Sequence, residues 1–484
     1  MAKLSRRQYL GGGAALGAGL LAAACDALSS RGEGGTGTEA EPTAPADPRL
    51  RIPPVRKQPN GRSQAIEPVT LRVLFTPGGA FTDFKAKGSQ HHVAELFTAA
   101  HPHFTITWQP WEFLGAQTWE QVLNLIAETA AAGQFYDVLQ LWDSVPADSG
   151  TYGALLGLNR FIRRDRFDLA DFWPGCVPGG TWEHDLYSLF TEVETNLLFY
   201  NRELFLSAGA PEPTETWAWD DLLLQARALT QGEGAGASYG FTPIQFKDGS
   251  NWAALPWIWG NGGDMFNEDQ TRSVVDQPAA VEALQWLPAL RHTHHVWPTA
   301  EQLRQATATE QENLFTLGKL AMLYSYRGSL GTEVTAAAYG QPKHSVAVPP
   351  QGPVRRANIL FPWPAFYLGG ATGVPDEAWS FLRWWTGEEA QLAWHHGRAI
   401  KGRNLTVPQT HPPARRSLAL ELVDWFGETD VAALEHAEMR RPQAKGNRLA
   451  EAFNKGLAPV WQGEQSVEAA TARVAQEQNA ILAG

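Results

Sequence analysis

The sequence predicts an α/β fold in which a parallel sheet is covered by helices on both faces. The first observation is an order of strand, helix, strand, helix and strand early in the foldable region, which is typical of such a sheet. The second is length: of 484 residues, the first 66 or so lack foldable composition, and the remainder suits two large lobes. The apolar fraction of 44% is ordinary for a globular protein.

Five segments between residues 69 and 142 carry this order. Strands are recognised by alternation or by a continuous apolar run, and helices by apolar residues at helical spacing. The predicted strands are residues 69–73, 104–108 and 138–142, and the predicted helices lie around residues 93–100 and 119–126. Ligands bind beyond the carboxyl ends of parallel strands, so residues 76–83 and 142–144 are expected to face a ligand.

A second set of elements begins near Asn196. Thr216 is expected to cap a helix over residues 217–229. Asp276 is expected to cap a helix that Pro278 opens and that Pro288 kinks or ends. Buried strands are expected at residues 197–200 and 239–242, and further helices around residues 378–385 and 467–474. The chain shows no internal repeat.

The first 25 residues have the layout of a signal peptide. A basic start is followed by a short apolar run, residues 11–24, that ends in small side chains. This run is shorter than the roughly 20 residues of a membrane span. Residues 5–10, which contain Arg6 and Arg7, resemble a twin-arginine export signal. The alternative is that the two arginines are only an ordinary basic start.

Residues 21–25 (LAAAC) resemble a lipobox, in which Cys25 becomes the acylated first residue of the mature chain. Ala22 stands where leucine is usual, and a plain signal peptide cut nearby is the alternative. Residues 26–67 favour the lipoprotein, because they are rich in Gly, Pro, Thr, Ala and charge and have little to bury. About 40 flexible residues span roughly 35 Å, a tether that an unanchored protein does not need. We therefore expect an extracytoplasmic protein, lipid-anchored to the cytoplasmic membrane.

Charge and composition exclude several classes of function. The formal net charge is −12, and an acidic chain without a basic stripe argues against nucleic acid and against a polybasic membrane-docking patch. Two cysteines are too few for a disulfide framework, and Cys176 is expected to be a small buried residue. The 20 Trp leave several beyond the core for an aromatic-lined cleft.

Residues 187–201 (YSLFTEVETNLLFYN) resemble the crossing between lobes in the family 1 extracellular solute-binding proteins of ABC importers, the maltodextrin-binding type. Four more segments resemble the family in the same order, so that the resemblance runs from about residue 68 to the end. These segments are residues 211–217 (PEPTETW), 259–264 (WGNGGD), 315–322 (FTLGKLAM) and 348–353 (VPPQGP).

The resemblance implies a two-lobed periplasmic-binding-protein fold of type II, with the ligand cleft between the lobes. The N-terminal lobe then comprises residues 68–193 plus 358–414, and the C-terminal lobe residues 194–357 plus 415–484. Lys401 departs from the family's usual proline, which affects the expected third crossing. The implied protein is a monomer without catalysis, cofactor or metal. It captures a small molecule, expected to be a sugar, for an ABC permease.

Candidate ligand contacts follow from aromatic faces that stack on sugar rings and from polar groups that pair with hydroxyls. By position in the family, Trp142 and Asp143 face the cleft at a strand end, and Glu194 matches a ligand-contacting carboxylate. Glu192 shares the strand face of Glu194, with a solvated strand face as its alternative. The other candidates are Thr82, Asp83, Trp252, Trp257, Trp259, Tyr326, Arg327, Trp363 and Trp461. An ordinary polar loop is the alternative for Thr82 and Asp83, and Trp252, Trp257 and Trp259, as a set, are more often core.

Two other patterns in the sequence could indicate esterase or zinc chemistry. Residues 236–240 (GASYG) fit an esterase pattern, but a Gly-rich turn precedes them and a strand follows, the reverse of a nucleophile elbow. Adjacent histidines such as His395 and His396 lack the spacing of a zinc helix and are expected at the surface. The alternatives for function are an exported polysaccharide-active enzyme and a binding protein for a polyamine or peptide.

Overall fold

The computed structural model describes residues 67–75, 89–110, 124, 126–129, 131–133, 136–141, 154–243, 251–306, 314–326, 343–400 and 411–484. All of them belong to one compact unit, Ile52–Gly484. The predicted signal peptide, Cys25 and nearly all of the predicted tether lie outside the described residues. None of the helices in the described ranges combines the length and the apolar character that a bilayer span requires.

The predicted parallel sheet is confirmed in the first half of the molecule. Strand β1 (Val69–Phe75) pairs in parallel with β2 (Phe104–Pro110) and with β3 (Val138–Leu141). Helix α2 (Ser89–Ala100) joins β1 to β2. The described part of the next predicted helix is helical and buries Ile126.

Two long antiparallel strands follow in the sheet, β11 (Asn358–Gly369) and β7 (Ser188–Asn201). β11 pairs with β3 through residues 365–368 and with β7 through residues 360–367. Beyond β7 lie β9 (Leu320–Tyr326) and β8 (Tyr239–Pro243), so the order is β2-β1-β3-β11-β7-β9-β8. The predicted strands at 197–200 and 239–242 are therefore confirmed.

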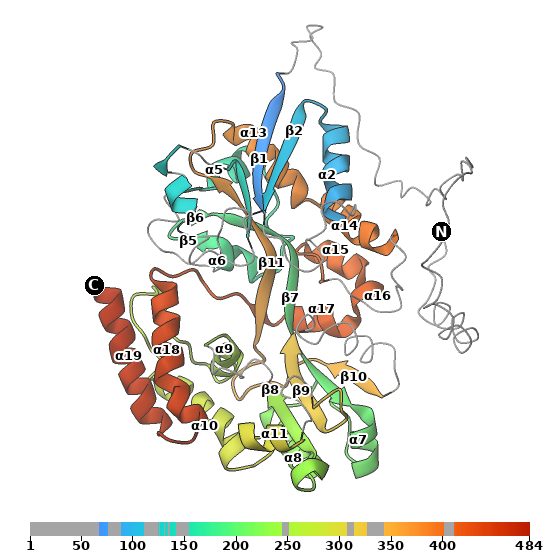
Figure 1. Cartoon of the computed structure of the whole chain (residues 1–484), viewed down its shortest axis with the longest axis vertical. Coiled ribbons are helices and arrows are strands. Elements are labelled where there is room, and N and C mark those ends of the chain that lie inside the picture. Colours follow the sequence, from blue (N-terminus) through green and yellow to red (C-terminus); the bar gives the residue numbers. More distant parts are fainter. Residues whose placement is uncertain are drawn as a thin grey trace, which may run out of the picture. The chain divides into compact units, whose positions relative to one another are not determined.

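β7 and β11 run from one half of this sheet into the other (Figure 1). All fourteen residues of β7 are buried. Its first part pairs with β11, and its last part pairs with β9 and with β10 (His344–Ala347). The two-lobed α/β architecture predicted from the sequence therefore depends on a pair of strands that both lobes share.

Two predicted N-caps are wrong by one or two residues. Helix α8 (Trp219–Leu229) is preceded by Ala218 rather than Thr216 as its N-cap. Ala218 and Trp219 still pair with the backbone of Gln351, which delays the helix, and the carboxylate of Asp221 accepts the N–H of Ala218 at 2.9 Å. The sequence could not reveal a partner 133 positions away.

Helix α10 (Pro278–His292) has Gln277 as its N-cap rather than Asp276, and it continues for four residues past Pro288. Pro288 is buried, so core burial of this helix outweighs the missing donor. The prediction that Pro288 could end the helix is wrong.

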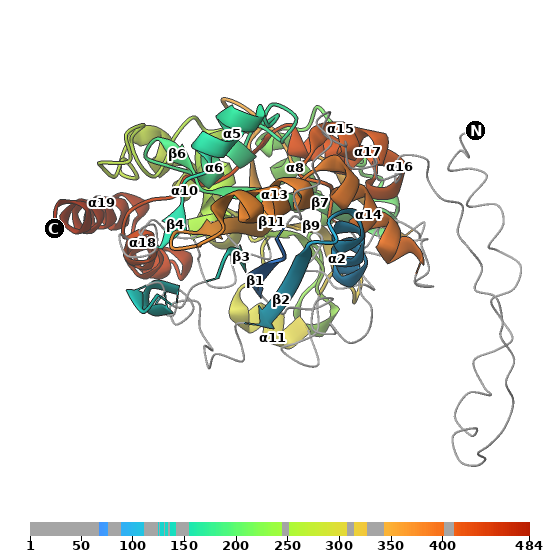
Figure 2. The ribbon, with the colours of Figure 1, turned by 90° about the horizontal axis from the view of Figure 1, so that it is seen from above.

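The predicted amphipathic helices near the C-terminus are confirmed. Helix α13 (Pro375–Trp385) buries Ala378, Phe381, Leu382 and Trp385, and α19 (Val467–Ala483) buries Val467, Ala470 and Val474. Helix α19 lies beside α18 (Gly446–Trp461) in both views (Figures 1 and 2). The remaining elements are β4 (Leu155–Leu156), α5 (Asn159–Asp165), α6 (Cys176–Gly180), β5 (Thr181–Trp182), β6 (Asp185–Leu186), α7 (Arg202–Ala208), η4 (Gly234–Gly236), α9 (Asn251–Gly260), α11 (Ala300–Ala306), α14 (Glu388–Ile400), α15 (Arg416–Glu421), α16 (Val423–Phe426), α17 (Glu428–Leu434) and β12 (Ala437–Glu438).

The two glycines of the GASYG segment differ in the space around them. A Cβ on Gly240, in β8, would meet the carbonyl oxygen of Ala226 in α8 at 1.9 Å, whereas a Cβ on Gly236 would meet nothing within 4 Å. We expect Gly240→Ala to lower the free energy of unfolding by about 2 kcal/mol or more, because the helix must move off the sheet. Chemical denaturation measures this difference.

Gly236→Ala is the matched control and should unfold like the parent protein, because Gly236 has no positive φ and no close neighbour. Equal stability of the two variants would contradict the close contact between β8 and α8.

Candidate functional site

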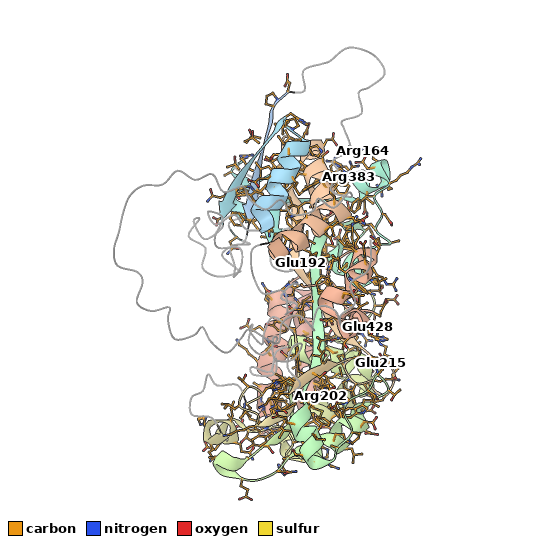
Figure 3. The ribbon with its side chains drawn as sticks, turned by 90° about the vertical axis from the view of Figure 1, so that its right-hand side faces the viewer. Arg164, Glu192, Arg202, Glu215, Arg383 and Glu428 are labelled. Carbon is orange, nitrogen blue, oxygen red and sulfur yellow. The ribbon has the colours of Figure 1, made fainter. Side chains whose placement is uncertain are left out.

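Two predicted ligand contacts, Glu192 and Glu194, lie on one face of β7 at the crossing between the lobes. Glu194 is opposite Phe361 of β11 and Glu192 is opposite Trp363. Figure 3 shows Glu192 between the part of the molecule that carries Arg383 and the part that carries Arg202. Their exposed fractions are 0% for Glu192 and 7% for Glu194. The alternative of a solvated strand face is therefore wrong for both carboxylates.

Each of these carboxylates has a histidine beside it. Oε2 of Glu194 is 3.3 Å from Nε2 of His411, and Oε1 of Glu192 is 4.0 Å from Nδ1 of His395. His395 is fully buried in α14, with its ring 5.4 Å from that of Phe426. The prediction that the adjacent histidines lie at the surface is therefore wrong for His395, because a carboxylate 203 positions earlier gives it a polar neighbour in the core.

The chain segment before α15 brings His411 to this place. The backbone N–H of Val193 donates to the carbonyl oxygen of Pro412 at 2.9 Å, and that of Ala414 donates to Thr191 at 3.0 Å. The segment thus lies along the edge of β7 that β11 leaves free. It adds a histidine to the face of the carboxylates, which the sequence alone did not indicate.

Aromatic rings from the neighbouring strands complete the cluster. Tyr326 of β9 is opposite Asn196 of β7, which puts its side chain on the same sheet face as Glu194. The rings of Tyr326 and Phe361 have centroids 5.6 Å apart. Burial, and then the charge of Glu194, raise the pKa of the Tyr326 hydroxyl. Sequence reasoning predicted Tyr326 and Glu194, but Phe361 was missed because nothing marks it within an aromatic strand.

The Glu194 cluster is our name for Glu194, Tyr326, Phe361 and His411. It combines an acidic acceptor, a phenolic hydroxyl, an imidazole and two aromatic rings from separate parts of the chain. These groups can accept and donate hydrogen bonds to hydroxyls while the rings cover apolar C–H faces. The arrangement suits binding of a polar organic molecule.

Several other predicted contacts lie outside the described residues. They are Thr82, Asp83, Trp142, Asp143 and Arg327, and the same holds for the side chains of Trp252 in α9 and Trp363 in β11. These seven remain predictions.

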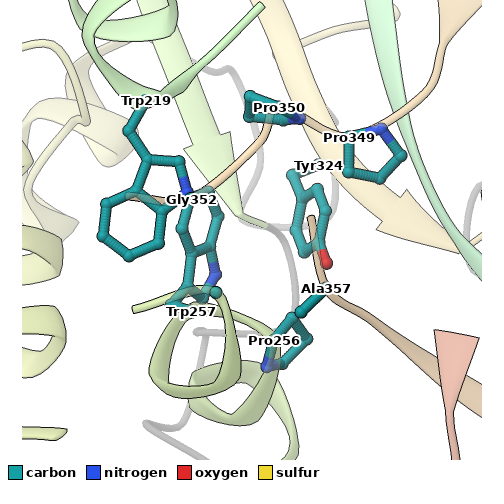
Figure 4. Close-up of a pocket in the computed structure, with 9 residues that line it drawn as sticks. Trp219, Pro256, Trp257, Tyr324, Pro349, Pro350, Gly352 and Ala357 are labelled. Carbon is teal, nitrogen blue, oxygen red and sulfur yellow. The ribbon is translucent and has the colours of Figure 1, made fainter. Parts of the chain in front are cut away.

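The other three tryptophans are core residues. Trp257, Trp259 and Trp461 have exposed fractions of 3–5%. Trp257 stacks on Trp286 at 5.1 Å and contacts Tyr324 at 5.2 Å. It lines a pocket of only about 10 Å³ with Trp219 and Tyr324 (Figure 4), about the space of one water. Protein rings therefore cover Trp257, and it is not retained as a ligand contact.

Asn358 fixes the crossing through a buried polar cluster. Its Nδ2 donates to the carbonyl oxygen of Asn196 at 2.8 Å, and its Oδ1 accepts from the hydroxyl of Tyr324 at 3.2 Å and the N–H of Ile359 at 2.9 Å. One side chain thereby links β7, β9 and β11. Further along β11, Pro362 and Pro364 lack the N–H with which other strand residues donate to the ladder.

Other chemistry finds no support at the described residues. Ser238 of the GASYG segment follows the short helix η4, pairs through its backbone with Gln231 and precedes a strand, which is not a nucleophile elbow. Cys176 is buried and free, as predicted, and burial raises the pKa of its thiol. Within the described ranges no three His, Cys, Asp or Glu side chains lie where they could hold a metal ion.

The family of this chain follows from its similarity to known proteins. The bacterial extracellular solute-binding protein family matches residues 78–392. This chain belongs to that family. The match includes β7, β9 and β11, and it confirms the resemblance that the sequence segments indicated.

Individual relatives are distant. A probable ABC transporter-binding protein of Deinococcus radiodurans is 26% identical over 302 residues, which are 60% of this chain and 67% of that protein. The chain spans 66–67% of the length of the curated relatives that it matches.

Solved structures share the fold over nearly their whole length. The sugar-binding protein MalE of Xanthomonas citri has a TM-score of 0.68 at 18% identity and covers 86% of this chain and 98% of its own. The cyclic alpha-maltosyl-1,6-maltose binding protein of Arthrobacter globiformis has a TM-score of 0.67 at 19% identity, with 86% and 99% covered. At these identities the likeness concerns the fold, a mixed α/β periplasmic-binding-protein fold.

The hydrogen bonds of Asn358 predict how substitutions at the crossing change the stability of the protein. We expect Asn358→Leu to lower the free energy of unfolding by about 2–4 kcal/mol, because the buried Asn196 carbonyl loses the Asn358 donor and the buried Tyr324 hydroxyl loses one of its two side-chain partners. Tyr324→Phe is the control and should lower it by only about 1 kcal/mol, since Asn358 keeps its other two bonds. Denaturant unfolding of both variants measures the difference, and equal losses would contradict the central role of Asn358.

Proposed function

We propose that this protein is the substrate-binding lipoprotein of an ABC importer, which captures a sugar or oligosaccharide between its lobes and delivers it to a membrane permease. The observation that carries the proposal is the Glu194 cluster at the crossing of a solute-binding fold. Family membership supports reversible binding without chemistry. In this mechanism the ligand shifts an equilibrium between open and closed forms, and the closed form docks on the permease.

The chemistry of the Glu194 cluster favours a neutral hydroxylated ligand. A carboxylate next to a histidine can accept hydroxyl hydrogen bonds in a partly dry site, where such bonds are strong. The rings of Tyr326 and Phe361 lie 5.6 Å apart on the same sheet face and offer apolar surface for a sugar ring. Proteins that share the fold are described as binding maltose-type sugars, which makes α-linked glucans the first ligands to test.

The runner-up functions are less well supported. A glycosidase needs two carboxylates on opposite sides of the scissile bond, ~5–9 Å apart, whereas Glu192 and Glu194 share one strand face and Glu192 is fully buried. A polyamine-binding protein would use several acidic groups, and in the described part of the molecule the group beside Glu194 is a histidine, His411. An oligopeptide is the third candidate ligand, and it belongs among the compounds to be tested for binding.

Export and anchoring also belong to the proposal. The basic start, the short apolar run and Cys25 support lipid attachment outside the cytoplasmic membrane. The pair Arg6 and Arg7 supports the twin-arginine route.

Lipid attachment can be checked by labelling in a bacterial host with a clickable palmitate analogue. We expect labelled protein in the membrane fraction and its loss with Cys25→Ser. Cys176→Ser serves as the control and should keep the label, because Cys176 is buried in the folded protein. A label that survives Cys25→Ser would refute the anchor.

Ligand binding is tested with a panel of glucose, maltose, maltotriose, spermidine and a tripeptide. At a ligand concentration one hundred times Kd, stabilisation should reach about 2.7 kcal/mol, which thermal unfolding detects. Glu194→Gln should weaken carbohydrate binding about 10- to 100-fold, because it replaces a charged acceptor, and Glu233→Gln, at an exposed position, should not. A shift with spermidine or peptide alone would overturn the sugar assignment, and release of reducing ends with turnover would support the enzyme instead.

A further inference from the structure

A buried histidine with unpaired nitrogen atoms lies at one edge of the sheet. His344 is the first residue of β10, and its exposed fraction is 7%. Within the described part of the chain, neither of its ring nitrogens has a hydrogen-bond partner. Native proteins pair nearly all of their buried polar side chains. His344 is therefore an exception, and its surroundings determine what a change in its charge would do.

The side chain of His344 faces an apolar cluster. Val346, two residues along β10 and hence on the same face of the strand, packs against this cluster. The ring of Phe315, a fully buried member of the cluster, lies 4.8 Å from the imidazole ring. A charge on the imidazole would therefore be buried beside hydrocarbon groups, which costs free energy unless a hydrogen-bond acceptor compensates for it.

The polar side chain opposite His344 does not supply that acceptor. Asn201 of β7 is directly across from His344 in the strand register, and residues opposite each other share a sheet face. The Oδ1 atom of Asn201 already accepts the N–H of Glu203 at 3.0 Å and that of Leu204 at 3.3 Å. These two bonds use both lone pairs of the oxygen, and they cap α7.

Two charged groups act on the imidazole. Lys343 precedes it in the chain, and Nζ of Lys343 lies 3.3 Å from Oε2 of Glu203 in α7. Burial, and then the charge of Lys343, lower the pKa of the His344 imidazole, whereas the charge of Glu203 raises it. The imidazole is therefore neutral in the folded protein at pH 7, while the unfolded chain takes up a proton as the pH falls below about 6.5.

The position of His344 in the sheet makes the consequence local. β10 has four residues and, among the described strands, pairs with β7 alone. The carbonyl oxygen of Lys343 accepts the N–H of Arg202 at 2.8 Å, so the start of β10 also holds the start of α7. A short strand with few bonds opens at a lower free energy than the centre of a sheet. Destabilisation at His344 therefore acts first on β10 and α7.

We propose that His344 is an acid-sensitive switch, in which uptake of a proton by the imidazole weakens the attachment of β10 and α7 to β7. The folded form binds this proton less readily than the unfolded form does. The contribution to stability is therefore complete above about pH 6.5 and decreases as the pH falls below that value. Because the chain belongs to an extracellular family, the switch responds to the pH outside the cell.

Denaturant unfolding between pH 7.5 and pH 5 tests the switch. His344→Phe keeps a ring beside Phe315 but cannot take up a proton. As the pH falls over this range, the unfolding equilibrium constant of the parent should increase about fivefold or more beyond that of His344→Phe. His184→Gln, at an exposed position, is the matched control and should follow the parent. Equal pH dependence of the parent and His344→Phe would overturn the proposal.

Two substitutions that keep His344 should change the acid response in opposite directions. Lys343→Met removes the repelling charge and leaves Glu203, so the response should become smaller than that of the parent. Glu203→Gln leaves the charge of Lys343 beside the imidazole, so the response should become larger. Both side chains are exposed, so each change should be only about twofold. These variants give an independent readout if His344→Phe is unfolded at pH 7.5, and a change in the same direction in both would contradict the switch.

Hydrogen exchange of the parent protein locates the acid response. After correction for the intrinsic effect of pH on exchange, the amides of residues 198–201 and 344–347 should lose about threefold or more of their protection at pH 5 relative to pH 7.5. The amides of β3 should keep their protection. An equal loss over the whole sheet, or full protection of β10 at pH 5, would place the response elsewhere and overturn the proposal.

Discussion

The architecture depends on two antiparallel strands that both lobes share. β7 is buried over its whole length, yet it carries two glutamates and an asparagine near its centre. Buried charges and amides require partners. Helix α14 provides His395 for Glu192, the segment before α15 provides His411 for Glu194, and β11 provides Asn358 for the backbone of Asn196. The need to satisfy these groups brings distant parts of the chain to the crossing.

The same constraint concentrates polar chemistry where a ligand can use it. Elsewhere in the second lobe the core is aromatic, with Trp219, Trp257 and Trp286 in mutual contact. At the crossing, by contrast, Glu194 keeps a small exposed fraction and lies beside Tyr326. The packed rings stabilise the lobe, whereas the partly exposed carboxylate of Glu194 is the group that the proposed ligand would contact.

The fold was predictable because its signals are local. Alternation in residues 69–73 and helical spacing in α13 and α19 follow directly from which faces are buried, and the structure confirms them. The proximity of Glu194 and Tyr326 followed from the family resemblance. What failed depended on pairing between distant segments. Gln351 moves the start of α8, Glu192 draws His395 into the core, and Val193 brings His411 to Glu194.

The prolines of β11 affect one edge of that strand. The N–H of Val193 and the carbonyl oxygen of Thr191 bond to the segment at residues 412–414, so Pro362 and Pro364, which lie opposite them, turn their nitrogen atoms away from β7. They lie between the pairing of β11 with β12 and its pairing with β3, where none of the described strands pairs with that edge. Because these two positions have no N–H, the edge offers few donors to another strand, which disfavours strand addition and aggregation there.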